Sequence, residues 1–174
     1  MYEKKRFEIY LPIEELMEKY YNFEITSSKC KQCSEYKKKW SCPDFSFIPA
    51  LFLHNFSSFR FIVDRVSNKG TSNAEEAQNR LFKEKLLFDQ EMRELETDFP
   101  GSYALIAQEC VQCKTCSRLS GLPCIYPEIM RYGPESMGIL AIKLIEDKFN
   151  FTVKWSNGVS IPDYYVLAGG ILLP

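Results

Sequence analysis

Residues 102–127, "SYALIAQECVQCKTCSRLSGLPCIYP", join a short apolar run directly to a cluster of cysteines. The run "SYALIA" (102–107) predicts a short buried strand. Four cysteines follow it: Cys110, Cys113, Cys116 and Cys124. A loop that leaves a sheet strand is positioned by a rigid scaffold. This stretch therefore predicts a β-sheet that holds a cysteine-rich loop at its end.

A second cysteine-rich loop is predicted nearer the N-terminus. Residues 27–50 read "SSKCKQCSEYKKKWSCPDFSFIPA", and their Ser, Lys and Pro content is typical of loops and turns. The loop contains three cysteines: Cys30, Cys33 and Cys42. Both cysteine regions lie on connections beside predicted strands.

The remaining segments alternate between strand and helix patterns. Strands are predicted at 6–10 and 58–66, and a final antiparallel hairpin at 151–155 and 163–173. Helical spacing of apolar residues predicts helices at 11–23 and 134–149, with Pro134 near the start of the latter.

The clearest helix is predicted between residues 72 and 99. Ser72 and Glu75 fit a capping box, and Pro100 with Gly101 end the helix. Its apolar stripe consists of Ala77, Leu81, Phe88, Met92 and Leu95.

This order of elements predicts an α+β fold. We expect a single domain over 1–174, with a small mixed β-sheet, two to three helices and the two cysteine-rich loops. No long Gly/Ser-rich or Pro-rich linker interrupts the chain of 174 residues.

Composition narrows the classes of function. Hydrophobic residues make up 45% of the chain, enough for a packed core, and the formal net charge is −1. This charge gives no reason to expect a nucleic-acid partner. There is no apolar run long enough to cross a membrane, and the N-terminus has no secretory signal, so we expect a cytoplasmic protein.

The seven cysteines are the informative residues. Their number is odd and a reducing compartment keeps thiols free, so clustered cysteines indicate metal ligands or redox groups rather than disulfides. The single histidine, His54, is not expected to be a ligand. A site made almost entirely of thiolates selects zinc, copper(I) or iron–sulfur clusters.

The C-x2-C-x2-C spacing favours an iron–sulfur cluster, because three thiolates from one tight loop can bind three irons of a [4Fe–4S] cubane. The fourth ligand is often next to a proline, and both Cys42–Pro43 and Pro123–Cys124 fit. In one grouping, Cys110, Cys113, Cys116 and Cys124 hold one cluster, while Cys30, Cys33 and Cys42 form a second, three-thiolate site. In the other, the two loops share ligands. Structural zinc remains the alternative, since two C-x2-C halves complete a tetrahedral site.

Basic and aromatic residues around the cysteines could assist metal binding or the docking of a partner. Lys37, Lys38 and Lys39 could stabilise thiolate ligands or dock an acidic redox partner. Trp40 and the nearby Phe45 and Phe47 could shield a cluster from water, although core packing explains them equally well.

The second cysteine region resembles the family of predicted metal-binding proteins called domain of unknown function 2284. The resemblance rests on Cys110, Cys113, Cys116 and Cys124 and on the upstream Cys30, Cys33 and Cys42–Pro43. It also includes Pro127, Arg131, Glu135, Gly138 and Ile139. It extends from about residue 28 to the end of the chain and implies metal binding.

Three hypotheses follow. The first is an iron–sulfur protein that serves electron transfer or supports a redox protein partner. The second is a structural zinc module that binds another protein. The third is an enzyme component in which the three-cysteine site leaves one iron open to substrate. No nucleotide-binding glycine loop or nucleophile-elbow motif is present.

Overall fold

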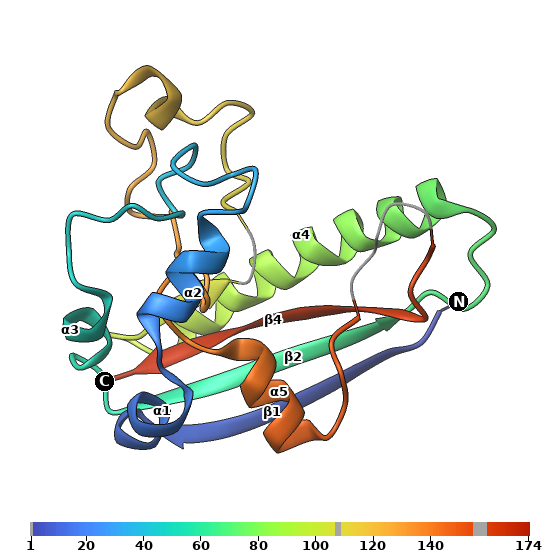
Figure 1. The fold of residues 1–174 in the computed structure, drawn as a ribbon, viewed down its shortest axis with the longest axis horizontal. Coiled ribbons are helices and arrows are strands. Elements are labelled where there is room, and N and C mark those ends of the chain that lie inside the picture. The colour runs from blue at the N-terminus through green and yellow to red at the C-terminus, as the bar shows by residue number, and fades with distance from the viewer. Residues whose placement is uncertain (1, 107–108, 155–159) are drawn as a thin grey trace.

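The computed structural model describes residues 2–106, 109–154 and 160–174. Figure 1 shows a β-sheet with helices on both sides and the two cysteine-rich loops together above one end of it. In chain order the elements are β1 (Lys4–Pro12), α1 (Ile13–Tyr20), α2 (Phe23–Cys30), α3 (Pro49–Leu53), β2 (Ser58–Ser67), α4 (Ala74–Asp98), β3 (Tyr103–Ile106), the 3-10 helix η1 (Ser117–Ser120), α5 (Ala141–Phe149) and β4 (Tyr164–Leu173).

The predicted α+β class is confirmed, but the sheet is antiparallel rather than mixed. Its four strands lie in the order β1-β2-β4-β3, and each neighbouring pair is antiparallel. The helix α4 connects β2 and β3, and a helical connection of this kind typically joins parallel strands. These two strands do run in the same direction. However, β4 lies between them and runs the other way, so no parallel pair forms.

The sheet has an apolar core on each face. Inward residues of α4, such as Phe88 and Met92, pack on Ile62 and Ile171 on one face. On the other face, α1 and α5 cover residues that include Phe59 and Phe61. The strands therefore bury apolar side chains on both faces, which makes the sheet a stable platform for the loops.

The start of α4 differs in detail from the prediction. The N-cap is Asn73, whose side chain accepts a hydrogen bond from the Glu76 backbone N–H at 2.9 Å. The Glu76 carboxylate accepts in return from the Ser72 backbone N–H at 2.8 Å. The capping box thus lies one residue later than the expected Ser72–Glu75 pair, since Asn is as good an N-cap as Ser.

The predicted helix at 134–149 is wrong in its first half. Residues 134–138 form turns, and α5 begins only at Ala141. Gly138 has φ +96° and a Cβ there would overlap the ring of Tyr21, so this position needs glycine and cannot be helical. Ile139 instead forms a β-bridge with Tyr21. The segment thereby packs against the junction of α1 and α2.

The predicted final hairpin is also wrong. Residues 151–154 form no strand, and 155–159 lie outside the described residues. β4 pairs with β2 on one side and β3 on the other. A central strand has no free edge, so 151–154 cannot pair beside it.

The number of helices was underestimated, because α2 and α3 lie within or beside segments that were predicted as loops. Cys30 is the last residue of α2 rather than a loop residue. α2 begins at the N-cap Asn22, whose side chain accepts from the Ile25 N–H at 2.9 Å. Among the described residues, no helix is long and apolar enough to span a membrane.

Candidate metal centre

The two cysteine-rich loops lie against each other above one end of the sheet (Figure 1). We call residues 31–48 the first loop and residues 109–133 the second loop. Cys30, Cys33 and Cys42 are the first cysteine group, and Cys110, Cys113, Cys116 and Cys124 are the second. All seven are free thiols, and all except the exposed Cys33 are partly buried.

All four cysteines of the second group line one pocket. The pocket is completed by Trp40 from the first loop and by Gln112, Ser117, Tyr126 and Met130 from the second. The cavity measures about 20 Å³, which is room for about one water molecule. The structure thus brings together the residues that the sequence grouped as one cluster site.

Short-range hydrogen bonds shape the second loop around this pocket. Cys116 precedes η1, which ends at Gly121 in the left-handed conformation. The Ser117 hydroxyl donates to the Pro123 carbonyl at 2.7 Å and so turns the chain back toward Cys124. This turn explains how a cysteine eight residues after Cys116 reaches the same pocket.

The second loop is also anchored to its neighbours. The Cys110 backbone N–H donates to the hydroxyl of the buried Ser41 at 3.0 Å. The Gln112 side chain donates to Asp89 of α4 at 3.2 Å. The start of the loop is therefore held between the first loop and α4.

The first cysteine group is built differently. Cys30 ends α2, and the Cys33 backbone N–H donates to the Cys30 carbonyl at 3.0 Å in a tight turn. Cys42 arrives from the far end of the first loop, where its N–H donates to the Lys39 carbonyl at 3.1 Å. The group therefore combines a helix end, a turn and a distant loop residue.

Burial disfavours the thiolate form of two cysteines in the first group and one in the second. Burial raises the pKa of the Cys30 thiol to about 11, with smaller contributions from Glu135, Cys42 and Cys33. Burial also raises the pKa of Cys42, and it does the same for Cys110 in the second group.

Arg118 joins the two loops. Its guanidinium donates to the backbone carbonyls of Lys39 at 2.8 Å and Cys42 at 2.6 Å, and to that of Asp44 at 2.9 Å. It also lies over the Trp40 ring, 5.1 Å from the ring centroid. One side chain of the second loop therefore determines the position of Cys42 and of the tryptophan that closes the pocket.

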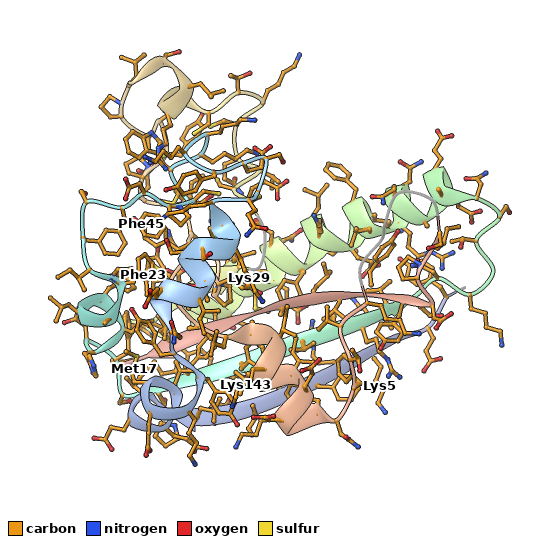
Figure 2. The ribbon with its side chains drawn as sticks, in the orientation of Figure 1. Lys5, Met17, Phe23, Lys29, Phe45 and Lys143 are labelled. Atoms are coloured by element: carbon orange, nitrogen blue, oxygen red, sulfur yellow. The ribbon has the colours of Figure 1, made fainter. Side chains whose placement is uncertain are left out.

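The neighbouring aromatic and basic residues have mixed roles. Trp40 lines the pocket and donates from its indole to the Leu122 carbonyl at 3.2 Å. Phe45 and Phe47 instead stack on each other with 5.0 Å between ring centroids and pack on the core, and Figure 2 shows Phe45 below the loops. Lys39 donates to the Cys110 carbonyl at 3.1 Å. His54 is exposed at the end of α3.

Residues that carried the family resemblance hold the second loop in place. Arg131 forms an ion pair with Glu96 of α4 at 2.7 Å, donates to the Glu128 and Met130 carbonyls, and lies over the Tyr103 ring. Gly138 permits the turn that follows Glu135, whose charge contributes to the raised pKa of Cys30. Burial raises the pKa of this Glu135 carboxyl.

The donor set fits a thiolate-ligated metal group, but the sulfurs are not gathered on one point. Within residues 2–106, 109–154 and 160–174, no group of three or more His, Cys, Asp or Glu side chains is arranged so that it could hold a single ion. The four thiols of the second group surround a space instead. Metal binding would therefore shift these side chains.

Sequence reasoning missed Arg118, Ser41 and Gln112. Arg118 and Gln112 lie between cysteines, and Ser41 directly precedes one, which is the only signal that could have singled them out. Their partners are backbone groups, or residues far along the chain, and the sequence does not place these nearby.

Comparison with protein families gives one match. The model for predicted metal-binding protein (DUF2284) matches residues 22–173, nearly the whole chain. Neither the curated proteins nor the solved structures yield a match. The matched range includes both cysteine groups and Arg118.

Proposed function

This chain belongs to the DUF2284 family of predicted metal-binding proteins, and we propose that it binds an iron–sulfur cluster of the [4Fe–4S] type and transfers electrons. Cys110, Cys113, Cys116 and Cys124 are the proposed ligands. The observation that carries the proposal is that one loop directs all four thiols to one pocket. Ligation by four cysteines is the usual way in which proteins hold such a cluster.

The spacing of the cysteines along the chain supports a cluster over a single ion. Four sulfurs bound to one zinc all lie about 2.3 Å from it, and two C-x2-C halves are enough to supply them. The second group instead has a C-x2-C-x2-C run, which places three thiols in one tight loop, as in proteins that hold a cubane.

The bound cluster would supply a one-electron carrier, and the protein residues would tune it. Trp40 covers one wall of the pocket and limits access of water, which influences the potential of a cluster. The partial burial of the thiols and the apolar side chain of Met130 in the pocket wall also limit access of water. Arg118 lies over the Trp40 ring, and the Trp40 indole donates to the Leu122 carbonyl, so both contacts fix the position of Trp40 against the second loop.

The first cysteine group is proposed to form a second metal site. With three thiols, it would leave one coordination position of the metal to another ligand. Because it is tied to the second loop through Arg118, it would lie beside the cluster. This position would suit a second redox centre or a site that stabilises the first.

Charge around the loops supports a redox protein as partner. Residues 29–44 contain five lysines against Glu35 and Asp44, although the chain as a whole has a net charge of −1. Lys37 and Lys38 are exposed on this surface. An acidic protein would therefore be guided to the end of the molecule that carries the cysteines.

Structural zinc is the second candidate, because a cavity of about 20 Å³ would have to expand less for one zinc ion than for a cubane. Anaerobic purification followed by an absorption spectrum and by iron, sulfide and zinc analysis separates the two. We expect a brown protein with roughly four irons and four sulfides per cluster. A colourless protein with stoichiometric zinc would reject the proposal and make the cysteines a scaffold.

A further inference from the structure

The outer edge of β1 carries an inference that does not depend on the metal. β1 is nine residues long and forms the bottom edge of the sheet in Figure 1. It pairs with β2 on one side, and no described strand pairs with its other side. The opposite edge strand, β3, has only four residues, and its Ile106 N–H donates to the Tyr132 carbonyl at 2.9 Å.

The direction of the free backbone groups follows from the antiparallel ladder. The Glu3 carbonyl accepts from the Ser67 N–H and the Ile13 N–H donates to the Ser57 carbonyl, both at 2.9 Å. The backbone N–H and C=O groups of the odd-numbered residues of β1 therefore point toward β2, because hydrogen-bonded and non-hydrogen-bonded positions alternate. The residues whose backbone groups point away from β2 are Lys4, Arg6, Glu8 and Tyr10, and all four are exposed. An edge of this kind can accept another strand.

We propose that β1 pairs with β1 of a second copy of this chain, antiparallel about a two-fold axis through Phe7, to form a continuous eight-stranded sheet. In this register Arg6 lies opposite Glu8 of the second copy, and Lys4 lies opposite Tyr10. Each of these pairs exchanges two backbone hydrogen bonds. The interface is self-complementary, as a two-fold dimer requires.

The charges of the strand select this register. Moving the axis to Arg6 would place this residue opposite its own copy, and moving it to Glu8 would do the same for the two glutamates. Like charges directly opposite one another are destabilising, whereas opposite charges stabilise a strand pair. An axis at Arg6 would also place Lys4 opposite Glu8, but together with the like-charge Arg6 pair. Only the axis through Phe7 pairs opposite charges without placing like charges opposite one another.

The side chains on the α4 face are already ordered for this contact. Arg6 donates to Asp64 at 2.7 Å and to Glu91 of α4 at 2.7 Å, and Glu8 accepts from Arg60 at 2.8 Å. Pairing would continue these ion pairs across the axis as a row of alternating charges. Ordered side chains lose less entropy on association.

A single pair of strands is small compared with the interface of a stable dimer. We therefore expect a dimer that forms and dissociates with concentration. Sedimentation velocity of the full-length, metal-loaded protein, from low to high micromolar concentration, would show the mass rising from 20.3 kDa toward twice that value. Amide hydrogen exchange of Lys4, Arg6, Glu8 and Tyr10 would slow over the same range.

Glu8→Arg tests the register, because it places a second arginine opposite Arg6. We expect dimerisation to weaken by roughly tenfold or more. Glu18→Arg makes the same change of charge at an exposed position of α1 and is expected to leave dimerisation unchanged. Thermal unfolding of both variants verifies the fold, and iron analysis shows whether the metal proposal stands separately.

Three results would overturn the proposal. One is a monomer at every concentration. Another is a dimer that leaves the four outward amides unprotected, which would place the interface elsewhere. The third is equal weakening by Glu8→Arg and Glu18→Arg, which would reduce the effect to overall charge.

Discussion

The two cysteine groups lie side by side, but only the second is assembled within a single loop. Its four thiols line one pocket, and turns such as the one from Ser117 to Pro123 bring them there. The first group takes Cys30 from the end of α2 and Cys42 from the far end of a loop, and its Cys33 is exposed. A local site can form from its own loop, whereas the first group depends on its surroundings.

The contacts that complete the first group come from other parts of the chain. Arg118 of the second loop donates to the Cys42 carbonyl, and the charge of Glu135 contributes to the raised pKa of Cys30. The second group also has contacts from outside its loop, with Trp40, the Ser41 hydroxyl and Lys39, but all four of its cysteines come from one loop. We therefore expect the second group to retain its metal when the first is damaged.

Replacing one ligand in each group is expected to give the largest difference. Cys113→Ser should remove most of the iron held by the second group, because it removes the middle thiolate of the C-x2-C-x2-C run that would hold the cubane. Cys33→Ser should leave that iron in place. Iron and sulfide per chain, together with the visible spectrum of each anaerobically purified variant, measure the difference.

Equal loss of iron in the two variants would contradict this comparison. It would favour the other grouping predicted from the sequence, in which the two loops share ligands for one site. Unchanged iron in Cys113→Ser would reject the second group as the cluster ligands.

Arg118→Ala should weaken the link between the loops. The variant loses hydrogen bonds from a charged donor to three carbonyls, and each such bond contributes about 1.5–3 kcal/mol. Because the site is partly exposed, we expect a decrease of about 2 kcal/mol in the free energy of unfolding, measured in denaturant. Lys114→Ala, an exposed change in the same loop, should stay within about 0.5 kcal/mol.

The same variant sharpens the comparison of the two groups. Arg118→Ala should disturb the metal site of the first group more than that of the second, since Cys42 loses a direct contact. A stability equal to that of Lys114→Ala would show that Arg118 does not hold the loops together.

The smallest effect is expected from the surface charges. Oxidation of the reduced protein by ferricyanide, followed by stopped flow at low salt, should slow by about threefold in Lys38→Glu, because the basic first loop attracts an anion. Lys114→Glu makes the same charge change on the second loop and should have less effect. A rate that is insensitive to salt and to both changes would exclude electrostatic guidance at this end of the molecule.

Most strands and the long helix could be predicted because their apolar residues repeat with a clear period. β2 is rich in β-branched and aromatic residues, α4 has a helical apolar pattern, and the stripe from Ala77 to Leu95 does face the core. The helix predicted at 134–140 was wrong, because Met137 is buried without being helical. A buried side chain at helical spacing does not exclude a turn when Gly138 adopts a positive φ.

The sequence alone determined the α+β class, the two cysteine groups and the membership of a metal-binding family, because periodicity and cysteine spacing are local properties of the chain. Only the tertiary structure decided that β4 lies between β2 and β3, that Arg118 ties the two loops, and that Trp40 of one loop closes the pocket of the other. These features join residues far apart in the chain. They follow from which apolar faces and backbone carbonyls find partners when the chain packs, and no local pattern records this choice.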